Sequence, residues 1–144
     1  MLIQSLSLQN FRNFSMQSLN FAHSTLIYGQ NGSGKTSIIE AINLLASGES
    51  FRASRVEEML RLGTDLGRVQ GNFLGSDGEA IKLEVMLTSG ELQGKKTAYR
   101  LFAINDLRKS KKKFLGNLAV VTFRPEDLRL VEGSPARRRS FLDG

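Results

Sequence analysis

Cysteine and tryptophan are absent from this 144-residue chain, and histidine and proline are rare, with one and two residues. Without cysteine the chain can form no disulfide and no thiolate metal site, and His23 alone cannot anchor a zinc cluster, so it is expected in a loop. No apolar run approaches the length of a membrane-spanning helix, and the N-terminal residues lack a signal-peptide pattern. We therefore expect a cytoplasmic protein with no membrane partner.

The composition is that of a folded domain. Hydrophobic residues make up 40% of the chain and charged residues 24%, which is close to the average for globular proteins. The length suits one domain with a core of its own. Intrinsic disorder and low-complexity repeats are therefore not expected.

Positive charge is concentrated in the C-terminal part of the chain. Residues 1–90 hold 7 basic and 8 acidic residues, whereas residues 91–144 hold 13 basic and 6 acidic ones. Such a surplus attracts polyanions, of which nucleic acid is the commonest in a cytosol. A solvated, solubilising face is the alternative. The candidate DNA-binding residues are Lys109, Lys111, Lys112, Lys113, Arg137, Arg138 and Arg139.

Hydrophobic periodicity predicts an alternation of strands and helices. A helix is expected from Lys35 to a stop at Gly48, and a shorter one from Ser54 to Gly63. A third helix should begin at Ser134, with Pro135 in its first turn. The expected strands cover residues 2–8, 16–21, 25–28, 67–74, 80–87, 95–104 and 118–123, with turns at 10–13 and 76–78.

One motif carries chemistry. Residues 29–36 read Gly29, Gln30, Asn31, Gly32, Ser33, Gly34, Lys35 and Thr36, which is a complete G-x-x-x-x-G-K-[ST] phosphate loop. Glycine allows backbone N–H groups to converge on phosphate oxygens, Lys35 can reach the terminal phosphates, and the Thr36 hydroxyl can bind Mg²⁺. A strand before the loop and a helix after it are the context that this motif requires. The motif therefore predicts binding of a nucleotide with Mg²⁺, and leaves open which nucleotide is preferred.

Hydrolysis in this class also needs an acidic residue at the end of an apolar strand. The strand expected over 118–123 is followed by Arg124 and Pro125 instead, and Glu126 comes too late. We therefore expect nucleotide binding without turnover and assign no catalytic residue. A small autonomous P-loop enzyme is one alternative, and it would need that missing acid. A DNA-binding or interaction domain with a non-hydrolysing or vestigial nucleotide site is the other.

Further motifs resemble the RecF family of SMC-like, ABC-type ATPases. They are Asn10-Phe11-Arg12-Asn13-Phe14, the phosphate loop with Glu40-Ala41, Ser50-Phe51-Arg52, the run Val121 to Leu128, and Gly133-Ser134-Pro135 with Arg137 to Arg139. The match extends over residues 1–144. The resemblance implies an α/β P-loop NTPase fold, like lobe I of an ABC-type ATPase, with a mixed sheet and an antiparallel β-subdomain over residues 67–104. It also implies an N-terminal ATPase fragment, cut before the rest of lobe II, the signature motif and Walker B.

The same resemblance implies a role in DNA recombination and gap repair. Members of the family bind gapped or junction DNA in an ATP-dependent manner, form ATP-dependent homodimers, act with RecR and RecO, and support gap repair, replication restart and the SOS response. The full-length parent is expected to be a weak DNA-dependent ATPase.

The resemblance also assigns individual side chains. Arg12 is expected near the nucleotide phosphates, although an arginine in a turn is more often simply solvated. Arg137 to Arg139 could contact DNA or pair with the absent lobe, and Lys109 to Lys113 could form a DNA-facing edge or a solubilising one. Arg124 stands where related ATPases have a metal-contacting glutamine, so no metal ligand is assigned there. Phe11, Phe14 and Phe21 are expected in the core rather than stacked on bases.

Overall fold

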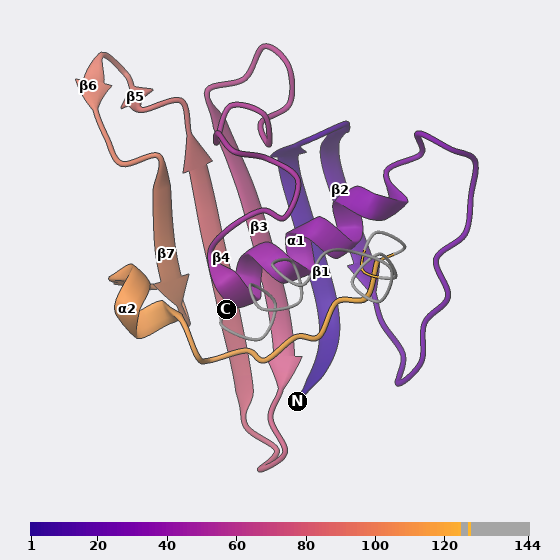
Figure 1. The fold of residues 1–144 in the computed structure, drawn as a ribbon. Coiled ribbons are helices and arrows are strands. Elements are labelled where there is room, and N and C mark those ends of the chain that lie inside the picture. The colour runs from indigo at the N-terminus through magenta and orange to yellow at the C-terminus, as the bar shows by residue number, and fades with distance from the viewer. Residues whose placement is uncertain (125–126, 128–144) are drawn as a thin grey trace, which may run out of the picture.

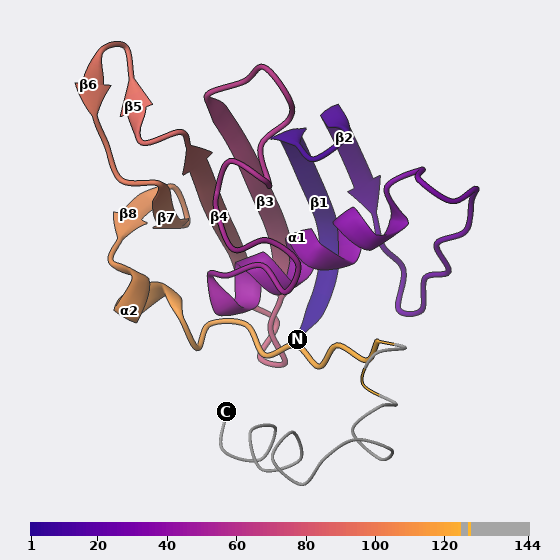
Figure 2. The ribbon, with the colours of Figure 1, turned by 45° about the horizontal axis from the view of Figure 1, so that its top comes forward.

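The computed structural model describes residues 1–124 and 127, and it is organised around a six-stranded antiparallel sheet crossed on one face by a helix (Figure 1). The strand order is β2-β1-β3-β4-β7-β8. A two-stranded hairpin, β5-β6, extends beyond β4 and β7 (Figure 2). The elements are β1 (Leu2–Phe11), β2 (Phe14–Asn20), α1 (Lys35–Ser47), β3 (Leu66–Leu74), β4 (Ala80–Thr88), β5 (Glu91–Leu92), β6 (Lys95–Lys96), β7 (Arg100–Ile104), β8 (Leu107–Lys109) and α2 (Lys111–Phe114).

Alternation along the strands explains why only one face of the sheet is covered. In β1, Leu6 and Leu8 are buried, whereas Ser5 and Ser7, which alternate with them, are half-buried on the opposite face. Strand β3 follows the same rule. An antiparallel sheet with one apolar and one polar face packs its core on one side and exposes the other to water. Here α1 contacts β1, β3 and β4 on the apolar side.

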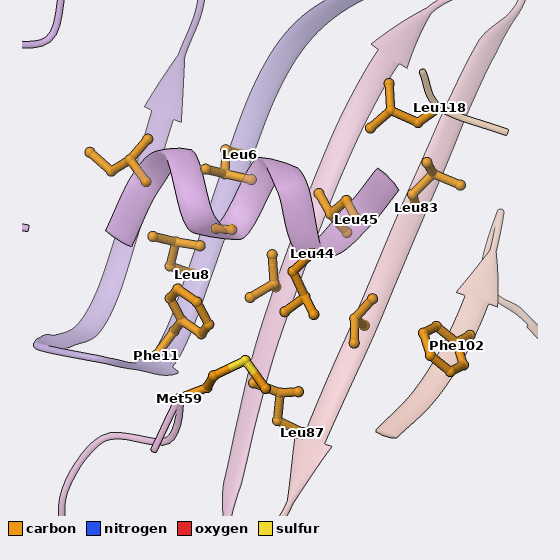
Figure 3. Close-up of a cluster of buried hydrophobic side chains, with 14 of the residues drawn as sticks. Leu6, Leu8, Phe11, Leu44, Leu45, Met59, Leu83, Leu87, Phe102 and Leu118 are labelled. Atoms are coloured by element: carbon orange, nitrogen blue, oxygen red, sulfur yellow. The ribbon is translucent and has the colours of Figure 1, made fainter. Parts of the chain in front are cut away.

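The core lies between α1 and this apolar face (Figure 3). Helix α1 contributes residues spaced three and four apart, which share one helical face. The buried hydrophobic residues are Leu6, Leu8, Phe11, Ile38, Ala41, Leu44, Leu45, Val56, Met59, Leu60, Val69, Phe73, Leu83, Val85, Leu87, Phe102, Phe114 and Leu118. The predicted core position of Phe11 is confirmed, and Phe14 and Phe21 pack against the core with partial exposure. His23 lies in an exposed loop, as expected.

The prediction for helix α1 is confirmed at both ends. It begins at Lys35 and ends at Ser47, and Gly48 closes it in the left-handed conformation with φ 70°. The Gly48 N–H donates to the Leu44 carbonyl oxygen at 2.8 Å. Glycine adopts this conformation without strain, so it ends the helix where the sequence indicated.

Two of the predicted strands do not form. Residues 25–28 and 118–123 have no regular secondary structure, and Leu26, Tyr28 and Val121 are 84%, 86% and 99% exposed. An extended segment becomes a strand only when a neighbour accepts its backbone hydrogen bonds. The sheet pairings found in residues 1–124 are all antiparallel and reach neither segment. The expected burial of residues 25–28 on both faces is therefore wrong as well, because an apolar run does not by itself supply a partner strand.

The second predicted helix, from Ser54 to Gly63, is also wrong. The segment forms turns. The Ser54 N–H donates to the Glu58 carboxylate at 3.2 Å, so the capping box expected with Glu57 does not form. Backbone bonds from Met59 and Leu60 to the Val56 carbonyl oxygen close a single turn. The predicted core side chains, Val56, Met59 and Leu60, are nevertheless buried. Burial here is achieved by a loop tied to the sheet, because Phe11 forms an isolated bridge to Leu60.

The antiparallel strands predicted over 67–104 form with altered boundaries, and they continue the sheet that contains β1 and β2. The turn at 76–78 joins β3 to β4, but the expected strand over 95–104 is divided into β6 and β7. Strand β8 and helix α2 were not predicted. The sequence signal for the β7-β8 hairpin is the pair Asn105-Asp106, since both residue types favour tight turns. In the structure both have positive φ, 49° and 64°.

The predicted third helix at Ser134, and Arg137 to Arg139, lie outside the described residues. Within the described part of the chain, no helix is both long and apolar enough to cross a membrane.

The core packing generates the first prediction. Leu8 is fully buried beneath α1, whereas Leu107 on the edge strand is 62% exposed. We expect Leu8→Ala to lower the free energy of unfolding by about 2–5 kcal/mol, because it removes buried apolar surface and leaves a cavity. Leu107→Ala is the matched control and should change it by less than about 0.5 kcal/mol. Urea denaturation followed by circular dichroism measures both, and equal effects would contradict this account of the core.

Candidate phosphate-binding site

The phosphate loop ends where α1 begins, so the helix N-terminus forms the floor of the site. Gly34 is the N-cap residue with φ 98°, it makes no side-chain capping bond, and the first turn contains no acidic residue. The first N–H groups of a helix have no partner within the helix, and the helix dipole gives that end partial positive charge. This end of α1 is therefore prepared to bind an anion.

Gly34 is required by close packing as well as by backbone conformation. A Cβ atom at this position would lie 2.5 Å from Phe14 Cζ and 3.0 Å from Asn13 Nδ2. The approach to Phe14 is so close that its ring would have to move, so the turn between β1 and β2 packs directly on the loop. The first two strands thereby fix the position of the phosphate loop.

The Lys35 ammonium is folded back over the loop. Its Nζ donates to the carbonyl oxygens of Gly29 and Gln30, both at 2.7 Å. The Ser33 N–H also donates to the Gln30 carbonyl oxygen, at 3.2 Å. Lys35 is thus held at the site by bonds to neutral acceptors, which an anionic ligand can replace with stronger charge-assisted ones.

Two hollows adjoin the loop. The first, which we call the loop hollow, has a volume of about 590 Å³, and the second, the side hollow, about 760 Å³. The loop hollow is lined by Arg12, Asn13, Asn31, Gly32, Gly34, Lys35, Thr36, Ser37, Arg52, Glu58, Leu60 and Leu62. The side hollow is lined by Thr25, Ile27, Lys35, Thr36, Ile39, Phe51, Arg52, Phe123 and Arg124. Lys35, Thr36 and Arg52 line both, so they stand where the hollows meet.

Arg12 lies beside the loop, but its guanidinium is engaged elsewhere. Its Nε and Nη2 donate to the two carboxylate oxygens of Glu40 at 2.9 and 2.6 Å, and its Nη1 donates to the Glu58 carbonyl oxygen. Glu40 is completely buried in α1. A bidentate pair of this kind fixes both side chains. The Arg12 backbone is fixed as well, because its N–H donates to the Met59 carbonyl oxygen at 2.8 Å.

Arg52 is a further residue at the site, and it was not among the predicted site residues. Its Nη1 lies 3.5 Å from Glu40 Oε2, and its side chain is 43% exposed, against 19% for Arg12. The Ser50 hydroxyl donates to Glu40 and accepts the N–H groups of Arg52 and Ala53, which shapes the turn that presents Arg52. The sequence feature that could have identified Arg52 is the short motif Ser50-Phe51-Arg52, just after α1.

The predicted site residues divide into two groups. Asn31, Gly32, Gly34, Lys35, Thr36 and Arg12 meet at the loop hollow, while Gly29 and Gln30 support Lys35. Lys109 and Lys111 to Lys113 lie on β8 and α2, apart from the loop (Figure 2). Arg124 binds Asp127 at 3.0 Å, and hydrogen bonds from Arg124 hold the pKa of Asp127 below its usual range.

Comparison with known proteins identifies the family. Residues 5–128 match the family described as AAA domain. The chain belongs to this family. Curated relatives include the "DNA replication and repair protein RecF" of Geobacillus sp. (strain WCH70), 36% identical, and that of Bacillus subtilis (strain 168), 34% identical. Each alignment covers 99% of the chain, which spans 36% and 37% of the two relatives.

Solved structures agree with this assignment to the AAA domain family. A structure described as the recombination mediator protein RecF-ATP in the RecFOR pathway superposes with a TM-score of 0.82 at 32% identity, covering 99% of this chain and 37% of that one. A head domain of SMC from Thermotoga maritima gives 0.61 at 23% identity over 83% of this chain and 43% of that one, which shows the fold alone. The expected P-loop fold and the resemblance to the N-terminal part of RecF are confirmed.

The buried ion pair at this site generates the second prediction. We expect Glu40→Gln to lower the free energy of unfolding by about 3 kcal/mol, because it leaves the Arg12 guanidinium without its anionic partner. Glu84→Gln is the control, since Glu84 pairs with the 44% exposed Arg68 at 3.6 Å, and such surface pairs contribute about 0–1 kcal/mol. Chemical denaturation measures the difference. Equal losses would mean that Glu40 has no special structural role.

Proposed function

We propose that this chain binds the phosphates of ATP at residues 29–36, as the nucleotide-binding part of a RecF-like DNA repair protein. The observation that carries the proposal is the convergence at the loop hollow of Lys35, the uncapped N-terminus of α1 and two arginines. Backbone dipoles and cations directed at one hollow stabilise a polyphosphate. The RecF relatives and the RecF-ATP structure support the choice of nucleotide.

A magnesium ion would accompany the nucleotide. Thr36 lies in the first turn of α1 and lines both hollows. A hydroxyl at this position in a phosphate loop suits Mg²⁺, which binds oxygen ligands and is shared with the phosphates. The ion would neutralise part of the phosphate charge.

The two arginines have different roles in this proposal. Arg12 borders the loop hollow and would add positive potential from a fixed position, since its hydrogen-bonding groups are occupied by Glu40 and Glu58. Arg52 makes one longer contact and is more exposed. Reorienting Arg52 toward a phosphate would cost less than withdrawing Arg12 from a bidentate pair. We therefore infer that Arg52 is the arginine that contacts the nucleotide directly.

We further propose that residues 1–144 bind nucleotide without turning it over. Neither an acid following an apolar strand nor a signature motif occurs in this sequence, and the first of these is what positions water and metal in this class. Weak DNA-dependent ATPase activity, an ATP-dependent homodimer, and association with DNA, RecR and RecO in a cytoplasmic gap-repair pathway are proposed for the full-length protein. Their support is the similarity to RecF.

The decisive experiment is calorimetric titration of the chain with ATP and Mg²⁺, with phosphate release followed in the same samples. We expect Lys35→Ala to weaken binding at least about tenfold, because one charge-assisted contact of about 1.5–3 kcal/mol is lost. Lys95→Ala, which removes an exposed lysine from the β5-β6 hairpin, is the control. Unchanged affinity in Lys35→Ala would refute the site, and release of phosphate by the chain alone would restore the small-enzyme alternative.

The division of labour between the arginines is testable separately. We expect Arg52→Ala to weaken ATP binding about tenfold without lowering the melting temperature, and Arg12→Ala to lower the melting temperature because it leaves Glu40 buried without its closest cationic partner. Arg55→Ala is the control, since Arg55 is exposed nearby but lines neither hollow. Melting curves and titrations distinguish the two effects. Loss of affinity in Arg12→Ala alone would reverse the assignment.

A further inference from the structure

A second cationic hollow lies at the edge of the sheet opposite β2. Strand β8 ends the sheet, and α2 follows it directly (Figure 2). The hollow, of about 460 Å³, is lined by the consecutive residues 108–111 and by 100–102 of β7. Four of these seven side chains are cations, and no acidic side chain of the described residues lines the hollow. We call this feature the edge hollow.

Pairing of β7 with β8 is what assembles the edge hollow. Phe102 lies opposite Lys109 and Ala103 opposite Arg108, so Arg100 is brought next to a basic run eight residues further along the chain. Arg100 is half-buried, and its Nε is fully buried without a hydrogen-bond partner in the described structure. A buried guanidinium nitrogen without an acceptor is costly, and an anionic oxygen would satisfy it.

One acidic side chain already neutralises part of the cluster. The Glu49 carboxylate accepts a bond from Lys111 Nζ at 2.6 Å. This hydrogen bond and the charge of Lys111, with a further effect of Arg100, lower the pKa of Glu49. Glu49 therefore remains ionised and is paired with Lys111. The other cations of the edge hollow, Arg100, Arg108 and Lys109, are available to a ligand.

We propose that the edge hollow binds backbone phosphates of DNA through Arg100, Arg108 and Lys109. A guanidinium with a buried, unpaired Nε suits a phosphate oxygen, and neighbouring cations suit consecutive phosphates of one strand. Lys112 and Lys113, both exposed on α2, continue the positive surface beyond the hollow. The choice of DNA as the polyanion rests on the proposed function in DNA repair, whereas the site itself is independent of the phosphate loop.

The experiment compares two double variants that remove equal charge. Arg108→Ala/Lys109→Ala alters the edge hollow, and Lys95→Ala/Lys96→Ala alters the exposed β5-β6 hairpin, which lines no part of it. Binding of a fluorescent DNA duplex is measured by anisotropy over a series of salt concentrations. We expect the first variant to bind about tenfold more weakly, with a salt slope reduced by about 2, because each phosphate contact contributes about 0.9. The second variant should remain within about twofold of wild type.

Two single variants test the mechanism in opposite directions. Arg100→Lys keeps the charge but removes Nε, and we expect it to weaken duplex binding about threefold. Glu49→Gln removes the competing carboxylate and frees Lys111, so it should strengthen binding about twofold. Thermal melting of each variant confirms folding. Unchanged or weaker binding by Glu49→Gln would count against the proposal.

The proposal fails if both double variants lose equal affinity for the duplex, or if the wild-type chain does not bind the duplex at all. It also fails if polyglutamate of equal charge displaces the labelled DNA as effectively as unlabelled duplex does. Failure of the nucleotide site would give a different result. In that case Lys35→Ala would bind ATP like wild type, while duplex binding would still depend on Arg108 and Lys109.

Discussion

The structure around the phosphate loop depends on the buried carboxylate of Glu40. This side chain is fully buried on α1, one turn after Thr36. It joins α1 to two other segments, the β1-β2 turn through Arg12 and the segment after α1 through Ser50 and Arg52. A buried carboxylate is tolerated only when its lone pairs and charge are satisfied. The need to neutralise one buried carboxylate therefore holds together the β1-β2 turn, which precedes the phosphate loop, and the segment that follows α1.

The antiparallel sheet provides the second constraint. Strands β1 and β2 meet in a turn whose side chains, Asn13 and Phe14, lie so close to the backbone of Gly34 that a Cβ atom there would displace the Phe14 ring. The same β1 strand carries Leu6 and Leu8 into the core under α1. The core thus positions the phosphate loop through two connections, the helix that follows the loop and the turn that packs on it.

Sequence reasoning succeeded where the signal is local. The phosphate loop, α1 with its stop at Gly48, and the β3-β4 turn all depend on residues within a few positions of one another. It failed for residues 25–28 and 118–123, because strand formation depends on a partner elsewhere in the chain. It also failed for the segment from Ser54 to Gly63, where tertiary contacts to Phe11 replaced a helix while keeping the predicted side chains buried.

The arginines show why site residues are harder to predict than motifs. Arg12 lines the loop hollow, but the sequence contains no sign that Glu40, twenty-eight residues away, engages its guanidinium. Arg52 borders both hollows because a turn after α1 returns the chain toward the loop. Arg100 joins the basic cluster only through the pairing of β7 with β8. In each case the deciding contact is long-range, and only the folded backbone supplies it.

Helix α1 also separates the two cationic sites of the molecule. Its N-terminus lies at the phosphate loop, and Glu49, just beyond its C-terminus, pairs with Lys111 of the basic edge. Thirteen residues of α-helix span about 20 Å, so the two sites lie well beyond the screening length of about 8–10 Å at ordinary ionic strength. Direct Coulomb coupling between ligands bound at the two sites is therefore weak. The physical link between the two sites is instead the packing of α1 on β1, β3 and β4.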